Sequence, residues 1–402
     1  MDWYDSLTKG GYFPNGFTLY GDSNGDGKLE PMDTNRDGRI EYFPTGGQGE
    51  YGYRSRESRS EILWKYKITD NNQFLLGTFY EEINFYDVGF KANFHPVYLY
   101  TVSQYTDFSN RYSWIRGDKN RKIYGGYFQD EWSFLENYYL LLSGRYDKYS
   151  DFGETFNPRA CLVWTISEKT LMKFMYGTAF KAPTMNELYS VNPIVMSNSN
   201  LDSEELESYE VNISHMFAEK LQGSLTVFNT VIENLIDISQ EPDYTIPGNP
   251  LYYTNYTKTK IYGAEAEIRY AFSEGDYLTL GYQYTHGEEE DFDTDYIPSI
   301  PRQQANAGIN LKLLEKLNWN IHLKYVGTQP REKEDPRPDL DAYTITDTTL
   351  NYKVLENTLL TFSVYNVFDE EDWYSPAPYG DYPQSDMQKE GRTFSVGTKV
   401  NF

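Results

Sequence analysis

The chain has 402 residues and a formal net charge of -24, from 60 Asp and Glu against 36 Lys and Arg. This charge argues against a nucleic-acid partner, because such proteins neutralise phosphates with Lys and Arg. The mean hydropathy of -0.68 and the lack of long apolar runs exclude a helical membrane span. A transmembrane barrel remains compatible, since only alternate strand residues face lipid, and 39 Tyr could supply its aromatic girdles. The alternative is a large soluble β-protein.

The N-terminus shows neither the basic nor the apolar region of a secretory signal, since it begins Met1-Asp2-Trp3-Tyr4. An exported protein needs such a signal, so we expect the chain to be a fragment or Met1 to be internal. Cys161 is the single cysteine, which excludes an internal disulfide and favours a packing role.

Oxygen-bearing side chains recur through residues 22–41 with the spacing of tandem calcium loops. The candidate ligands are Asp22, Asn24, Asp26, Lys28, Glu30, Asp33, Asn35, Asp37, Arg39 and Glu41, with Lys28 and Arg39 acting through their carbonyls. Calcium takes six to eight oxygens, and Gly27 and Gly38 permit the sharp turns. The repeat resembles EF-hand, dockerin and thrombospondin type 3 loops. It is most similar to the last, because no amphipathic helices flank it. An acidic, solvated loop without metal is the alternative.

Stretches of about ten residues with alternating polarity follow from residue 59 onward. Leu317, Trp319 and Ile321, for example, oppose Asn318 and Asn320. We predict about fifteen strands of an antiparallel transmembrane barrel. They span residues 59–68, 74–84, 122–134, 138–148, 157–166, 170–178, 206–217, 221–231, 259–272, 276–288, 302–313, 317–329, 343–353, 358–367 and 392–402.

Short turns of similar chemistry separate the two strands of each predicted pair, as in Phe134-Leu135-Glu136-Asn137 and Phe217-Ala218-Glu219-Lys220. Longer, Tyr-rich loops separate one pair from the next. Tight periplasmic turns and long extracellular loops are typical of outer-membrane barrels. We therefore expect residues 1–58 to be an extracellular loop and residues 59–402 to be barrel.

Several motifs occur in a fixed order along the predicted strands. They are Gly126-Tyr127-Phe128-Gln129-Asp130-Glu131-Trp132, Gly144-Arg145-Tyr146-Asp147, Phe156-Asn157-Pro158-Arg159, Phe180-Lys181-Ala182-Pro183-Thr184-Met185-Asn186-Glu187-Leu188-Tyr189, Gly263-Ala264-Glu265, Tyr365-Asn366-Val367-Phe368-Asp369 and Gly391-Arg392-Thr393-Phe394. This series resembles the C-terminal barrel of TonB-dependent outer-membrane transporters. The resemblance implies that the chain supplies about the last fifteen of about twenty-two strands and lacks the family's plug and TonB box.

The resemblance implies import of a scarce metal chelate across the outer membrane of a Gram-negative bacterium, driven through the TonB complex. Residues 180–189 look most like those of cobalamin and catecholate-siderophore receptors, and both cargoes remain open. We expect the chain to bind this chelate and to contact outer-membrane lipids and lipopolysaccharide. We also expect it to be a monomer and to hold calcium in a structural role. The alternative is a calcium-stabilised surface protein that binds glycans or acts as an adhesin without transport.

Aromatic residues of the loops offer flat, amphipathic contacts for such a substrate. The candidates are Tyr244, Tyr252, Tyr253, Tyr256, Trp373, Tyr374, Tyr379 and Tyr382. One Cys, four scattered His and no Gly-x-Ser-x-Gly motif give no convergent catalytic set, so we expect no enzyme activity.

Overall fold

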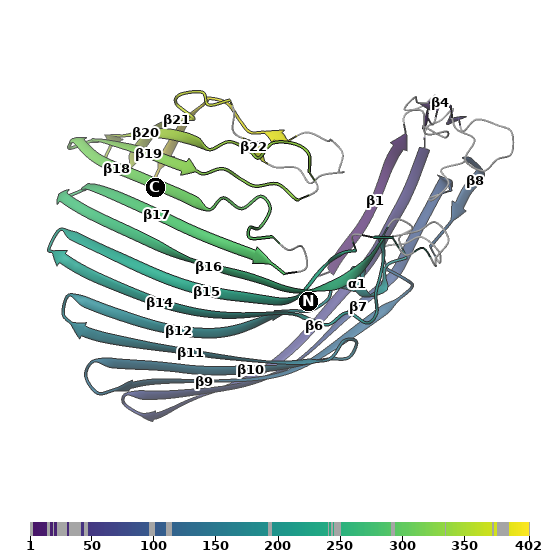
Figure 1. Ribbon diagram of the computed structural model, residues 1–402, viewed down its shortest axis with the longest axis horizontal. Coiled ribbons are helices and arrows are strands. Elements are labelled where there is room, and N and C mark those ends of the chain that lie inside the picture. Colours follow the sequence, from purple (N-terminus) through teal and green to yellow (C-terminus); the bar gives the residue numbers. More distant parts are fainter. Residues whose placement is uncertain are drawn as a thin grey trace.

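The computed structural model describes residues 3–13, 17–18, 20–21, 30–31, 42–43, 47–95, 101–109, 115–191, 195–239, 241–242, 244, 251–290, 294–333, 335–371, 374–375 and 386–401. These residues are almost entirely β-structure, and an 18-stranded sheet curls around a central space (Figure 1). The predicted all-β, antiparallel barrel fold is therefore confirmed. Within these residues, no helix is long and apolar enough to cross a membrane.

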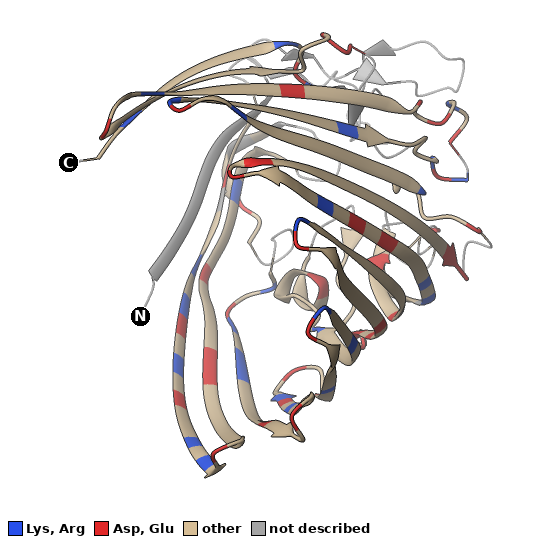
Figure 2. Cartoon of the chain, turned by 90° about the vertical axis from the view of Figure 1, so that its left-hand side faces the viewer, with Lys and Arg blue, Asp and Glu red and all other residues tan. Residues whose placement is uncertain are grey.

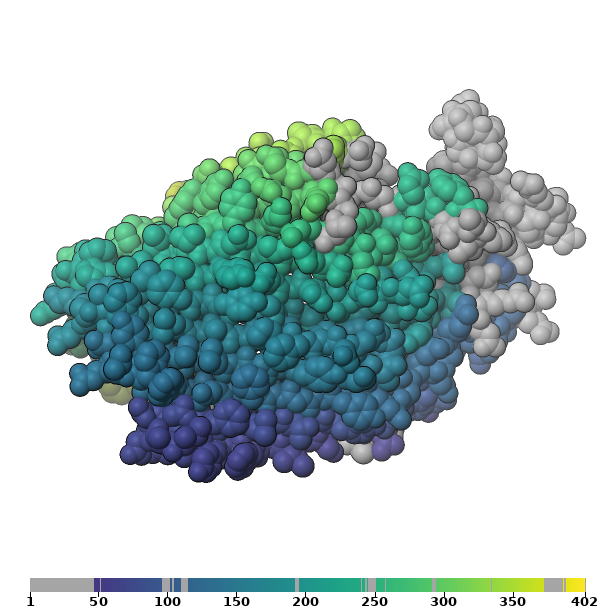
Figure 3. Space-filling model, turned by 60° about the horizontal axis from the view of Figure 1, so that its bottom comes forward, coloured from purple at the N-terminus to yellow at the C-terminus, as the bar shows by residue number. Residues whose placement is uncertain are grey.

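The main strands pair antiparallel with their neighbours along the chain, from β1 to β24. They are β1 Trp3–Phe13, β6 Gly47–Thr69, β7 Asn72–Phe94, β9 Lys119–Phe134, β10 Tyr138–Tyr149, β11 Glu154–Ser167, β12 Thr170–Lys181, β14 Glu204–Ala218, β15 Leu221–Ile238, β16 Leu251–Ser273, β17 Asp276–Glu289, β18 Gln303–Leu314, β19 Leu317–Val326, β20 Tyr343–Leu355, β21 Thr358–Tyr365 and β24 Thr393–Val400. Successive strands form adjacent bands on the molecular surface (Figure 3).

Shorter elements lie in the connections. They are β2 Phe17–Thr18, β3 Tyr20–Gly21, β4 Glu30–Pro31, β5 Tyr42–Phe43, β8 Thr101–Asp107, α1 Met185–Tyr189, β13 Val195–Met196, β22 Tyr374–Ser375 and β23 Met387–Gln388. The short turns gather at one end of the sheet and the longer connections at the other, as predicted (Figure 1). The connection between β10 and β11 is an exception, since it is a short turn on the loop side.

The N-terminal part differs from the loop predicted for residues 1–58. β1 runs from Trp3 to Phe13 and pairs with the first half of β6, which begins at Gly47. Residue 58 therefore lies inside a strand and marks no boundary in the described structure. β6 and β7 each have 23 residues, more than the nine to eleven or so that cross a bilayer, so both extend beyond it on the loop side.

Strand register gives the sheet two chemically different faces. Leu225, Ala266 and Tyr282 are neighbours on the outward face, whereas Thr226 and Glu265 pair on the inward face. Large apolar side chains on the outward face are widely exposed, for example Ile268 at 46%. Charged residues occur along the strands as well as in their turns (Figure 2). The structure thus has an apolar exterior and a polar interior wall.

Tyrosines mark the loop-side edge of the apolar exterior. Their hydroxyls donate to carboxylates at this edge: Tyr80 to Glu82, Tyr146 to Glu154, Tyr176 and Tyr209 to Glu207, and Tyr262 to Glu288. Tyrosine prefers the boundary between an apolar and an aqueous phase, where its ring is buried and its hydroxyl is hydrated. This row therefore indicates where the membrane ends.

Candidate functional site: the loop-side rim and the inner wall

The predicted calcium repeat lies almost wholly outside the described residues. Of its candidate ligands only Glu30 is described, as backbone of the short strand β4. Among the described residues, no three His, Cys, Asp or Glu side chains converge to hold a metal ion. The calcium loop therefore remains a prediction from the sequence.

The structure places some of the predicted substrate-contacting tyrosines. Tyr252, Tyr253 and Tyr256 lie on the loop-side half of β16, and Tyr244 lies in the connection before it. Tyr374 is described as backbone of β22, and Trp373, Tyr379 and Tyr382 lie outside the described residues.

Three of these tyrosines already have hydrogen-bond partners, and the Tyr244 hydroxyl donates to the Glu241 carboxylate at 3.2 Å. The Tyr253 hydroxyl accepts a hydrogen bond from Asn186 Nδ2 at 3.2 Å, and the Tyr256 hydroxyl donates to the Ile238 carbonyl at 2.9 Å. Tyr244 is 70% exposed and Tyr252 is 37% exposed. Tyr244 and Tyr252 thus remain the better placed of the four to meet a ligand.

The segment around α1 folds against the strand ends. Thr184 caps the helix by accepting from the Glu187 backbone N–H at 3.2 Å, and the Glu187 carboxylate accepts from the Thr184 N–H at 2.7 Å. Leu188, Leu201 and Ile236 form a buried cluster beneath it. The segment that contains α1 is consequently packed against the loop-side ends of the strands.

A buried arginine joins this segment to two strands. The Arg121 guanidinium, on β9, bonds Asp151 in the β10–β11 turn, with Nε 2.8 Å from the carboxylate. Its Nη2 donates to the Pro183 carbonyl at 2.8 Å. Arg121 and Asp151 side chains are only 8% and 6% exposed. Sequence reasoning missed this bridge, because its members are far apart in the chain and follow no local motif.

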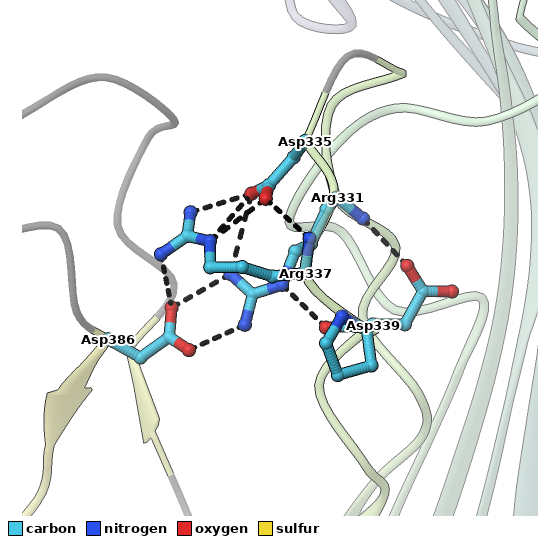
Figure 4. Close-up of polar contacts among 6 residues, drawn as sticks. Arg331, Asp335, Arg337, Asp339 and Asp386 are labelled. Carbon is cyan, nitrogen blue, oxygen red and sulfur yellow. Dashed lines mark hydrogen bonds and ion pairs between the residues drawn. The ribbon is translucent and has the colours of Figure 1, made fainter. Parts of the chain in front are cut away.

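A second buried ion network joins the β19–β20 connection to the β21–β24 connection (Figure 4). Arg331 binds Asp386 through both terminal nitrogens, at 2.8 and 2.5 Å, and Arg337 binds Asp335 at 2.6 Å. Arg337 also approaches Asp386 at 3.7 Å, and Asp339 accepts from the Arg331 N–H at 3.0 Å. We call these five residues the loop latch.

The latch arginines perturb the acids that they bind. Hydrogen bonds from Arg337 lower the pKa of Asp335 from 3.8 to about 2. The Asp386 carboxylate in turn raises the pKa of Arg331. Asp335 and Arg331 side chains are 3% and 6% exposed. The network is therefore ionised and shielded from water at neutral pH.

The inner wall carries a hollow of about 610 Å³ beside β9, β10 and β11. Its polar lining includes Glu61, Tyr127, Gln129, Ser143, Arg145, Asn157 and Arg159. At its edge, two guanidinium groups contact the Phe79 ring, Arg59 at 4.2 Å and Arg145 at 4.8 Å from the ring centroid. The hollow therefore combines hydrogen-bonding groups with ordered cations.

The fold and its rim define an outer-membrane β-barrel receptor. The barrel has an apolar outward face bordered by tyrosines, with short turns at one end and long, structured loops at the other. The family model described as "TonB dependent receptor-like, beta-barrel" matches residues 2–367, so the chain belongs to this family. It is an outer-membrane protein of the Gram-negative type.

Relatives of known sequence include two kinds of receptor. The chain is 26% identical over 297 residues to an iron-regulated outer membrane virulence protein of Vibrio cholerae, covering 69% of this chain and 44% of that protein. It is 27% identical over 230 residues to the vitamin B12 transporter BtuB of Photobacterium profundum, covering 57% and 36%. The chain thus spans less than half the length of these relatives.

Solved structures share the fold. The ferric enterobactin receptor PfeA of Pseudomonas aeruginosa superposes with a TM-score of 0.72 at 17% identity, covering 89% of this chain and 55% of that chain. The copper transporter OprC superposes with a TM-score of 0.67 at 16% identity, covering 89% and 57%. At such identities the likeness concerns the fold alone.

Proposed function

We propose that this chain is the barrel part of a TonB-dependent transporter that imports a scarce metal chelate, either a ferric siderophore or cobalamin. One observation supports the proposal most strongly. The barrel wall of this family encloses a polar interior, and at its loop end buried ion pairs and hydrogen bonds fasten the connections to one another. Relatives named for iron regulation and for vitamin B12 transport support both cargoes.

The proposed transport has two steps, ligand binding and ligand release, and each depends on a different part of the molecule. The rim holds a ligand, because its loops are fixed to one another and lose little conformational entropy on binding. We propose that release into the periplasm requires energy, which the TonB complex supplies.

The cargo is tested by calorimetry on the complete, refolded gene product with cyanocobalamin and a panel of ferric siderophores. We expect one chelate to bind with a Kd on the order of nanomolar. Failure of every chelate to bind would reject the proposed transport function. Tyr252→Ala and Tyr244→Ala should weaken binding, whereas Tyr270→Ala, on the outward face near the short turns, serves as the matched control.

We further propose that residues 22–41 bind calcium and thereby order the loop that precedes β6. Asp26→Ala combined with Asp37→Ala removes one ligand from each predicted loop and should abolish calcium binding in the same calorimeter. Unchanged calcium binding in this double variant would reject the assignment of ligands. Weaker chelate binding after calcium removal would show that the ordered loop contributes to recognition.

The calcium repeat also favours a second candidate, a calcium-stabilised surface protein that binds glycans or acts as an adhesin. The two functions make opposite predictions for the calorimetric panel. Calcium binding together with glycan binding and no chelate binding would favour the second candidate.

A further inference from the structure

Lysines lie just beyond the tyrosine edge on the outward face of two neighbouring strands. On β9, Lys122 is two residues closer to the loops than Tyr124, and on β10, Lys148 is two residues closer than Tyr146. Residues two apart on a strand share a face and are separated by about 7 Å. Both lysines therefore point outward at the level where the headgroups of membrane lipids begin.

The strand register makes Lys122 and Lys148 diagonal neighbours on this face. Lys148 lies opposite Tyr124, and Lys122 follows Tyr124 two residues nearer the loops. Side chains in this relation have Cβ atoms about 7 Å apart. Two flexible lysine stems over this distance can bring both ammonium groups to one anion. We call Lys122 and Lys148 the lysine clamp.

The lysine clamp keeps hydrogen-bond donors that the protein does not use. Within the described part of the chain, the Lys122 side chain makes no hydrogen bond or ion pair. Lys148 donates through Nζ to Glu154 at 3.1 Å, which leaves two of the three N–H groups of its ammonium. Glu82 lies opposite Lys122 on β7, but it accepts from Asn120 at 2.7 Å. The clamp therefore presents cationic donors to the exterior.

An open apolar stretch of the outward face lies beneath the clamp. Gly126 lies opposite Tyr146. Among the described residues, the only atom within 4 Å of a methyl group placed at Gly126 is the Gly77 carbonyl oxygen, at 3.7 Å. The exposed rings of Phe128 and Phe156 continue this surface toward the short turns. An acyl chain can therefore lie along aromatic side chains that lead up to two cations.

We propose that the lysine clamp binds a phosphate group of a phosphorylated lipid in the outer leaflet, whose acyl chain lies over Gly126 and Phe128. A phosphate accepts hydrogen bonds from both ammonium groups through separate oxygens. Lysine is a compact point charge that suits this contact. The apolar stretch selects a lipid over a soluble anion, because only a lipid covers both parts of the site.

A third outward lysine provides a matched comparison. Lys260 on β16 is two residues nearer the loops than Tyr262, and it too makes no side-chain contact within the described residues. It lies opposite Glu288 and diagonal to Glu290. Lys260 therefore has the same charge and depth as the clamp lysines, but acids and not a second lysine surround it.

The test measures binding of lipid A, with and without its phosphates, to the complete gene product in a zwitterionic detergent. Lys122→Gln and Lys148→Gln should each raise the Kd for phosphorylated lipid A about tenfold, as loss of a hydrogen bond between charged groups does. Lys122→Arg and Lys148→Arg should keep most of the affinity, since arginine also binds phosphate. Lys260→Gln should leave the Kd unchanged.

Four results would overturn the proposal. The Kd could be unchanged in both clamp variants, or Lys260→Gln could raise it equally, which would indicate attraction by overall charge. Equal binding of dephosphorylated lipid A would show that only the apolar stretch is used. Inorganic phosphate that binds alone as tightly as the lipid would assign the clamp to a soluble anion. Chelate binding is a separate measurement, so the transport function can stand when the lysine clamp fails.

Discussion

On the inner wall, the close packing of one phenylalanine against the neighbouring strand requires a glycine at a particular position. Phe79 is 5% exposed and lies directly over Gly125 of the neighbouring strand β9. A methyl group at Gly125 would lie 2.1 Å from the Phe79 ring, whereas at Gly126 the nearest atom would be 3.7 Å away. The glycine at 125 is therefore required by the ring, and the one at 126 is not.

Gly125→Ala should lower the free energy of unfolding by about 1–3 kcal/mol, because the Phe79 ring must move and lose its contacts with Arg59 and Arg145. Denaturant unfolding of the purified protein in detergent micelles measures the change. Gly126→Ala is the matched control and should change stability by less than about 0.5 kcal/mol. Equal effects of the two substitutions would contradict the packing argument.

The bridge from Arg121 to Asp151 makes a second prediction at this scale. Asp151→Ala leaves a buried guanidinium without its charge partner and should cost about 3 kcal/mol or more. The exposed pair Lys67–Asp70, 63% and 100% exposed, is the control, and Asp70→Ala should cost less than about 0.5 kcal/mol. A small effect of Asp151→Ala in the same unfolding assay would show that the bridge does not fasten the rim.

The sequence predicted the chemistry of individual residues but not the contacts that they make. It chose tyrosines for their chemistry, and the structure shows that Tyr253 and Tyr256 have hydrogen bonds within the rim. Alternation predicts which strand residues face inward, but it does not predict which charges of the loops find a partner. Arg331 and Asp386, for example, lie 55 residues apart in two different connections, and no local pattern relates them.

At the scale of elements, the loop latch joins two connections that would otherwise be independent. Breaking it should release the β21–β24 connection from the β19–β20 connection without unfolding the barrel, since the latch lies beyond the strands. The pH dependence of the latch follows from Asp335, whose pKa is about 2 when latched and 3.8 in the unfolded chain.

Ionised Asp335 favours the latched state, because its pKa there is lower than in the unfolded chain. This contribution is present above pH 3.8 and is lost as the pH falls toward about 2. The hydrogen-exchange protection of residues 327–342, measured relative to the intrinsic exchange rate at each pH, should therefore stay high at pH 5 and fall between about pH 4 and pH 2. In Asp335→Asn this fall should disappear, and protection should be low throughout. An unchanged profile in that variant would refute the role of Asp335.

The strands and short turns were predictable because both depend on local chemistry. Alternating polarity and turns such as Phe134-Leu135-Glu136-Asn137 appear where expected, with Leu135 at a positive φ of 53°. β1 was not predicted, since Trp3–Phe13 contains Gly10 and Gly11 and lacks clear alternation. Its pairing with β6 is a long-range contact that no local pattern reveals.

At the scale of the whole molecule, one continuous sheet has a polar face toward the interior and an apolar face toward the exterior. Backbone groups in a bilayer must be paired, which the strand ladder achieves along its length. The fold class and membrane location follow from alternation and loop asymmetry. The cargo does not, because it depends on side chains that converge only in three dimensions.

The most direct test of the account is uptake of radiolabelled metal chelates by a Gram-negative strain that lacks its own receptors and expresses the complete gene. We predict accumulation of one chelate that ceases when the tonB gene is deleted, while surface binding of that chelate persists. Accumulation that is independent of TonB, or binding without any accumulation, would contradict the assignment as an energised importer.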